Sequence, residues 1–123
     1  MGVVFQNTGM ANSLLDLTAL MPSWELSMRA EHKAKGTIKA YGDGVRDFLR
    51  WCGANGVEPE LTRVKAQAFV GDLLQCGVQP ATAHLRLKGL RGFSAWLASE
   101  GELDVDALAG VKSPRLDQKV IPE

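Results

Sequence analysis

The 123-residue sequence has little of what an active site usually requires. It contains two cysteines, which are too few for a disulfide scaffold, and two histidines. No cluster of His, Cys, Asp or Glu has the spacing of metal ligands. No segment alternates like a strand, so no glycine-rich phosphate loop can follow one. We therefore expect no metal, no cofactor and no stand-alone catalysis.

The sequence also lacks an excess of charge of one sign and a long hydrophobic run. Basic and acidic residues number 14 each, which argues against an indiscriminate polyanion binder but allows a local basic face. No apolar run approaches the roughly 18 to 20 residues that span a bilayer, and no secretory signal begins the chain. We expect a soluble cytoplasmic protein, with Cys52 and Cys76 reduced in the core.

Apolar residues recur at helical spacing from residue 13 onward. A first segment is expected to break at Pro22, and a second, capped by Ser23, to end by Gly36. The clearest helix spans about 37–54 and opens at Thr37. Its single apolar stripe consists of Ile38, Tyr41, Val45, Phe48, Leu49 and Cys52. Tyr41, the only tyrosine, is interpreted as a core residue rather than a nucleophile.

Two further helices are predicted at about 63–76 and 80–99. Thr62 is the expected N-cap of the first, and Pro80 suits the first turn of the second. Their apolar positions are Val64, Ala68, Phe69, Leu73 and Leu74, and then Leu87, Leu90, Phe93 and Leu97. Glycines Gly77 and Gly101 end them, and one helical turn is expected at 104–109.

These segments predict an all-α fold, a compact bundle of four to five short helices. Residues 1–12 are expected to be a disordered tail, and 13–110 the helical domain. Residues 111–123 have two prolines and little to bury, which is typical of an extended linker.

The basic residues of two helices each form an outer face. His84, Lys88 and Arg91 have the spacing i, i+4, i+7 and share one stripe, away from the leucines of their helix. The polar side of the helix at 37–54 carries Lys35, Lys39, Arg46 and Arg50. Such faces are either ordinary solvated surfaces or contacts for phosphates and base edges. Arg86 lies nearer the apolar sector, so we expect it to extend outward or pair with a carboxylate.

The order of these residues resembles a known family. The stretch TIKAYGDGVRDFLRWCGANG, from Thr37 to Gly56, is similar to a signature of tyrosine recombinases, the phage-integrase family. Leu61-Thr62 with Val64 and Phe69 resembles the short third helix of their N-terminal core-binding, or SAM-like, domain. The segment PATAHLRLKGLRGFSAWLASEG resembles the fourth helix, and VKSPRLDQKVIPE resembles the linker toward a catalytic domain, which we expect to lie outside this sequence.

The resemblance implies a non-catalytic domain that grips double-stranded DNA, the core recombination site, by two crossing helices in the major groove. It implies other recombinase protomers as partners on that DNA, and strand cleavage by a separate C-terminal domain whose catalytic set has no match here. Residues implied in DNA contact are Lys35, Thr37, Lys39, Arg46, Thr82, His84, Lys88, Arg91, Lys112, Arg115 and, farther along the linker, Lys119. The alternative is a helical protein-interaction module with an exposed patch of Trp96, Leu85 and the segment 14–20.

Overall fold

The computed structural model of the chain describes residues 15–112, and this part contains helices and no strand. The helices are α2 (Leu17–Ala30), α3 (Lys35–Ala54), α4 (Arg63–Gln75) and α5 (Pro80–Ser99). The all-α fold class is thereby confirmed. The predicted tail, 1–12, lies outside the described residues. Within the described part, no helix is long and apolar enough to cross a membrane.

Helix α2 runs through Pro22, where the sequence predicted a break. Asp16 is its N-cap, accepting a hydrogen bond from the Ala19 N–H at 3.1 Å. One stripe continues across the proline, and all of its members are buried: Leu17, Met21, Trp24 and Met28. A proline inside a helix costs about 3 kcal/mol, and burying each large apolar side chain gains roughly 1.5–3 kcal/mol. The prediction was wrong because the continuous stripe outweighs the proline.

Helix α3 begins at Lys35, two residues earlier than predicted. Its N-cap, Ala34, makes no side-chain hydrogen bond, and Gly36 lies inside the first turn rather than ending the previous helix. The turn between α2 and α3 instead depends on His32, whose φ is +65° and whose N–H donates to the Arg29 carbonyl. Thr37 is consequently the third residue of α3 and not its cap.

Helices α4 and α5 begin and end almost where the sequence predicts. Thr62 caps α4 by accepting from the Lys65 N–H at 3.1 Å, and Pro80 is the first residue of α5. The buried face of α4 differs from the prediction, because Val64 is 74% exposed. The i, i+3, i+4 set that reaches the core is Ala66, Phe69 and Val70. Cys76, expected in the core, is the exposed C-cap of α4, whereas Cys52 is buried as expected.

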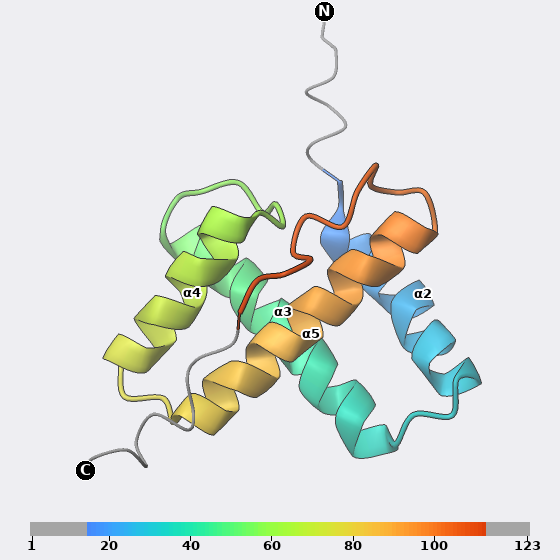
Figure 1. Cartoon of the computed structure of the whole chain (residues 1–123), viewed down its shortest axis with the longest axis horizontal. Coiled ribbons are helices and arrows are strands. Elements are labelled where there is room, and N and C mark those ends of the chain that lie inside the picture. Colours follow the sequence, from blue (N-terminus) through green and yellow to red (C-terminus); the bar gives the residue numbers. More distant parts are fainter. Residues whose placement is uncertain (1–14, 113–123) are drawn as a thin grey trace, which may run out of the picture.

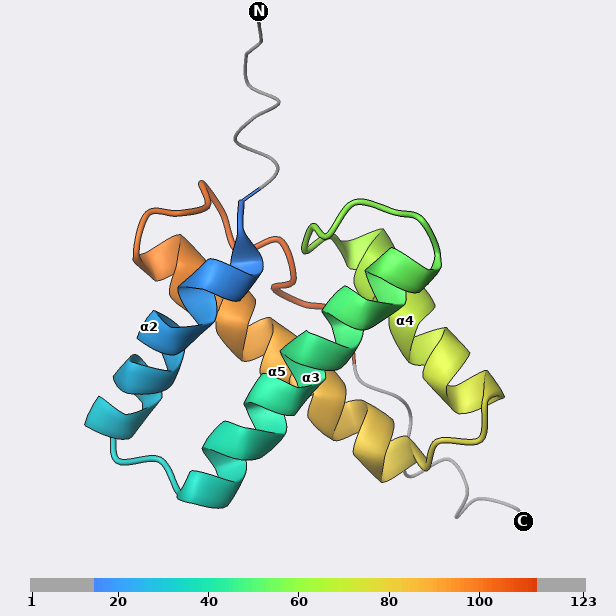
Figure 2. The ribbon, with the colours of Figure 1, turned by 180° about the vertical axis from the view of Figure 1, so that it is seen from behind.

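The long helices α3 and α5 cross as an X, with α2 packed on one side and α4 on the other (Figure 1, Figure 2). The core fills both sides of this crossing. Trp24 of α2 packs against Phe93 of α5 in a tilted arrangement with 4.7 Å between ring centroids, and Phe48 of α3 meets Phe69 of α4 edge-on at 5.5 Å. The predicted apolar stripes of α3 and α5 are confirmed as the centre of the core.

Two glycines allow the crossing helices to touch backbone to backbone. A Cβ atom built on Gly89 would lie 2.6 Å from the Tyr41 carbonyl oxygen, and one built on Gly44 would lie 2.7 Å from that of Arg86. Both neighbours are main-chain atoms, so no side-chain rotation relieves the clash. The separation of α3 and α5 therefore requires glycine at both positions.

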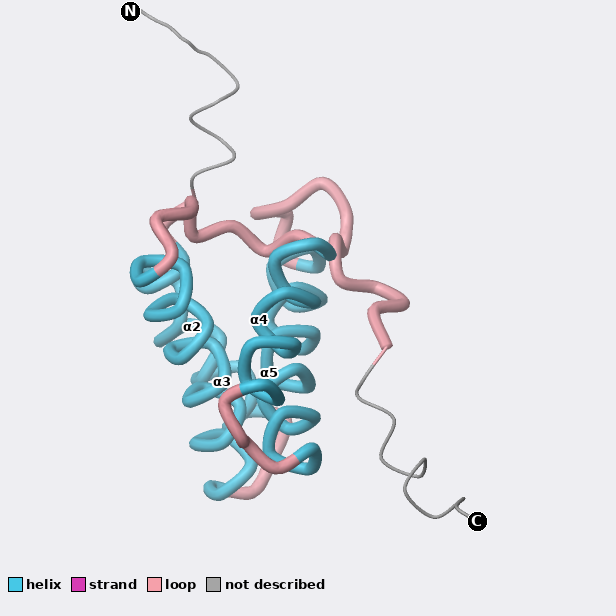
Figure 3. The backbone as a smooth tube through the Cα atoms, turned by 90° about the vertical axis from the view of Figure 1, so that its left-hand side faces the viewer, coloured by secondary structure: helices cyan, strands magenta, loops and turns pink. Residues whose placement is uncertain are grey.

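The segment after α5 folds back over one end of the bundle, beside the start of α2 (Figure 3). It forms turns rather than the predicted helical turn at 104–109. The buried Ser94 hydroxyl donates to Asp106 Oδ1 at 2.6 Å, and the same oxygen accepts from the Leu108 N–H. Leu108 and Val111 are buried, so packing includes the first residue of the predicted linker, and the linker beyond residue 112 lies outside the described part.

We predict that Gly89→Ala destabilises the fold by roughly 1–3 kcal/mol, the usual cost of overpacking a core, because its methyl group would push α5 away from α3. Gly71→Ala is the matched control, since Gly71 lies inside α4 with nothing within 4 Å of a built Cβ. The control should be neutral or stabilising by up to about 1 kcal/mol. Urea denaturation followed by circular dichroism measures both; equal midpoints for the two variants would contradict the close approach.

Candidate nucleic-acid interface

The crossing places the beginnings of α3 and α5 at the same edge of the molecule (Figure 1, Figure 2). The first backbone hydrogen bonds of the two helices run from the Ile38 N–H to the Ala34 carbonyl and from the Ala83 N–H to the Gln79 carbonyl. The N–H groups of the residues that precede Ile38 and Ala83 in each helix therefore have no intrahelical acceptor. Neither helix has an acidic residue in its first turn. We call residues 35–37 and 80–82 the paired N-termini; their helix dipoles make this edge attractive to anions.

Three predicted site residues belong to the paired N-termini. Lys35 is the exposed first residue of α3. Thr37 and Thr82 are half-buried and each is the third residue of its helix, so the two helices present the same side chain at the same position. The structure thus places residues 45 positions apart in the sequence at the same edge, one on each arm of the crossing, and this edge carries hydroxyl groups and N–H groups without intrahelical acceptors.

The remaining cations of α3 are already paired with carboxylates. Lys39 Nζ lies 2.8 Å from Asp43 Oδ2, and Arg46 Nη2 donates to Asp43 Oδ1 at 3.2 Å. Arg46 also reaches Glu25 Oε2 of α2 at 3.6 Å. The hydrogen bond from Lys39, and next the one from Arg46, hold the pKa of the Asp43 carboxyl below its ordinary value. At neutral pH these two cations therefore share an ionised partner.

The basic stripe of α5 is different. Among residues 15–112, no carboxylate lies within ion-pair distance of Lys88 or Arg91. Lys88 is exposed and Arg91 half-buried. His84 is half-buried too, and its Nδ1 is enclosed without a hydrogen-bond partner in this part of the chain. Lys88 is accordingly the most available cation of the predicted stripe.

Asp47 is a residue that the sequence did not single out. Its Oδ2 lies 2.7 Å from Arg86 Nε, an ion pair rather than a well-aligned hydrogen bond, and its Oδ1 contacts Arg50. Arg86 therefore pairs with a carboxylate, as one of the two sequence interpretations held. The side chains are 22% and 27% exposed for Asp47 and Arg86, so the pair sits at the edge of the crossing. Only the Asp47–Arg50 spacing was visible in the sequence.

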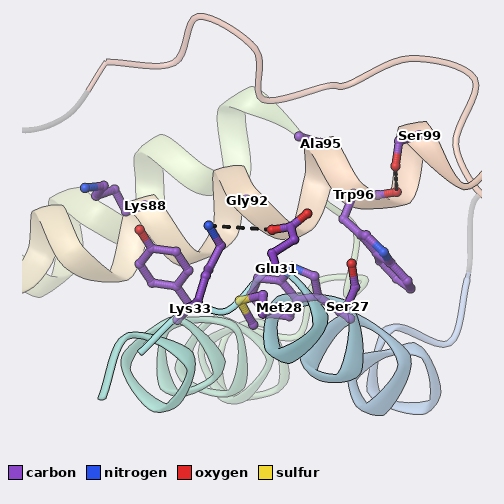
Figure 4. Close-up of a pocket in the computed structure, with 11 residues that line it drawn as sticks. Ser27, Met28, Glu31, Lys33, Lys88, Gly92, Ala95, Trp96 and Ser99 are labelled. Atoms are coloured by element: carbon purple, nitrogen blue, oxygen red, sulfur yellow. Dashed lines mark hydrogen bonds and ion pairs between the residues drawn. The ribbon is translucent and has the colours of Figure 1, made fainter. Parts of the chain in front are cut away.

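A groove of about 370 Å³ lies between α2 and α5, next to the basic stripe (Figure 4). Tyr41 and Trp96 contribute aromatic side chains to its lining. Lys88 also lines it, and Glu31 and Lys33 form an ion pair at one rim with 3.6 Å between their charged atoms. The apolar patch expected for the alternative function is not continuous, because Leu17 is buried and Leu15 and Leu20 pack against the core. Leu14 lies outside the described residues.

The remaining predicted site residues lie at the C-terminal end of the chain. Lys112 is exposed at the end of the described part, and Arg115 and Lys119 lie beyond it. Residues 15–112 contain no group of three His, Cys, Asp or Glu side chains arranged to hold a metal ion. Burial raises the pKa of the Cys52 thiol, which keeps this thiol protonated and unreactive.

Comparisons with known proteins identify the family of the chain. A family model for the N-terminal SAM-like domain of phage integrase matches residues 20–101. Tyrosine recombinase XerC of Methylobacterium nodulans is 28% identical over 112 residues, which cover 85% of this chain and 35% of the relative. The protein of that name from Xylella fastidiosa is 31% identical over 86 residues, covering 68% and 29% respectively. The chain thus spans about a third of the length of these relatives, and no solved structure matches it significantly.

We predict that Asp47→Ala destabilises the fold by roughly 1–3 kcal/mol, because it leaves the half-buried Arg86 without its partner. Asp104→Ala removes the same charge from an exposed position and should change the free energy of unfolding by less than about 0.5 kcal/mol. Thermal melts of both variants measure the difference. A melting temperature for Asp47→Ala equal to that of the control would show that the pair contributes nothing to stability.

Proposed function

Because the chain belongs to the family of phage integrase N-terminal SAM-like domains, we propose that it grips double-stranded DNA at a core recombination site. In this proposal α3 and α5 lie against the major groove. Strand cleavage is the task of a C-terminal domain of a longer tyrosine recombinase, and this domain itself is not catalytic. The relatives that support the proposal are named tyrosine recombinases and are about three times as long as the matched part.

The single observation that carries the proposal is the pairing of the two helix N-termini at one edge. Free N–H groups at the start of a helix bind phosphate, and the dipole favours the negative charge. Thr37 and Thr82 add hydroxyl groups at matching positions, and Lys35 adds an exposed charge that has no carboxylate within ion-pair distance among residues 15–112. In this proposal the two sites contact two phosphates of one duplex, and these contacts fix the domain relative to the groove.

The free cations of α5 supply the second part of the grip. Lys88 and Arg91 follow Thr82 along the same helix, and neither has an ion-pair partner among residues 15–112. They are therefore available to phosphates or to guanine edges as the helix enters the groove. Lys112 and Arg115 are proposed to follow the DNA backbone, and other recombinase protomers are proposed as partners assembled on the same site. The grip needs no metal and no small-molecule cofactor.

The groove between α2 and α5 favours a second candidate function, a protein-interaction module. Tyr41, Gly92 and Trp96 give it an apolar lining on which a partner segment could pack. The two functions differ in their response to salt. Phosphate contacts weaken steeply as salt rises because counterions are released, whereas apolar packing in a groove does not.

The test of the proposed function is an amide chemical-shift titration of the chain with a short duplex, first at low and then at moderate salt. We expect shifts at the paired N-termini and along 82–91 that fade as salt rises. Absence of shifts there at low salt would contradict the proposal. Shifts confined to the lining of the groove, and insensitive to salt, would favour the interaction module.

We further predict that Lys88→Ala weakens DNA binding uniformly across duplex sequences and lowers the salt slope by about one, as loss of one phosphate contact does. Arg63→Ala is the control, because Arg63 is exposed at the start of α4, at the end of the molecule opposite the paired N-termini (Figure 1). Fluorescence anisotropy at several salt concentrations measures both. Equal losses in the two variants would mean that only total charge matters.

A further inference from the structure

Lys39 lies one helical turn from the paired N-termini, yet its ammonium group is occupied. Its Nζ is 2.8 Å from Asp43 Oδ2, although the Lys39 side chain is 76% exposed and has ample room to point elsewhere. A carboxylate oxygen and a phosphate oxygen accept the same hydrogen bond from an ammonium group. Asp43 therefore holds the position on Lys39 that a DNA phosphate would take.

We propose that Asp43 is a built-in competitor of DNA phosphate, which lowers the affinity of the domain by retaining Lys39. This inference rests on the proposed function. When a duplex approaches, Lys39 must leave Asp43 before it can reach a phosphate, and the unpaired carboxylate then repels the DNA backbone. Both effects reduce the net gain from Lys39 and make binding depend more strongly on the other contacts, those of the paired N-termini and α5.

The surroundings of Asp43 separate this role from a structural one. Asp47, one turn farther along α3, fixes the half-buried Arg86 at the crossing, so its removal disturbs the fold. Asp43 contacts only exposed cations, and Arg46 keeps a second partner in Glu25 at 3.6 Å when Asp43 is neutralised. Replacing Asp43 by its uncharged amide therefore releases one cation, Lys39, and leaves the helix crossing intact.

The experiment measures duplex affinity of the full 123-residue chain carrying Asp43→Asn or Asp104→Asn, by fluorescence anisotropy at several salt concentrations. Asp104 is an exposed residue of the loop at the opposite end of the bundle, so its substitution gives the same change in net charge. We expect Asp43→Asn to bind about two- to fivefold more tightly than Asp104→Asn, the range for release of one exposed ion pair. The slope of log affinity against log salt should steepen by up to about 0.9, the change for one full phosphate contact, to the extent that Lys39 stays on Asp43 when the wild-type chain is bound.

Repeating Asp43→Asn in a Lys39→Ala background completes a double-mutant cycle. The gain should shrink there to the part that comes from removing the carboxylate charge, because no ammonium group is released. A gain in the wild-type background equal to that of Asp104→Asn, or one that is undiminished without Lys39, would overturn the competitor role while leaving DNA binding intact. Absence of binding by every variant at low salt, with circular dichroism showing folded chains, would instead contradict the proposed function itself.

Discussion

The fold depends on the contact between the backbones of α3 and α5 at Gly44 and Gly89. Side chains elsewhere in the core can relieve a clash by rotating about their bonds. The Tyr41 carbonyl oxygen cannot, and it would lie only 2.6 Å from a Cβ atom on residue 89. This contact sets the distance between the two long helices, and the flanking helices then fill the space on either side with Trp24 and Phe69. It also places both helix N-termini at one edge, so the constraint that packs the core also builds the candidate interface.

Much of the helical pattern could be predicted from local chemistry. Thr62 as a cap, Pro80 at a first turn and the leucines of α5 behave as their residue types suggest, because their partners are a few residues away. Pro22 and Val64 misled the prediction for one shared reason. Whether a proline is tolerated, or a valine buried, depends on what the opposite side of the bundle offers, and that information lies in other helices.

The candidate site, too, could be predicted from the sequence only in part. Helical spacing identified the basic faces, and the resemblance identified the helices that carry them. The sequence could not show that Lys39 and Arg46 of α3 are engaged by Asp43, while Lys88 and Arg91 of α5 have no carboxylate within ion-pair distance among residues 15–112, because charge pairing depends on rotamers and on neighbours such as Glu25. It also gave no sign that Thr37 and Thr82 lie at one edge, since only the crossing makes residues of separate helices equivalent. A net charge of zero conceals this uneven arrangement.

The buried return of the chain after α5 has a mechanical consequence. Leu108 and Val111 act as two anchors, and the hydrogen bond from Ser94 to Asp106 ties the same loop to the middle of α5. A pull applied to the chain at residue 112 is therefore transmitted through these contacts to α5, the helix that carries Lys88 and Arg91, which turns that helix into a lever.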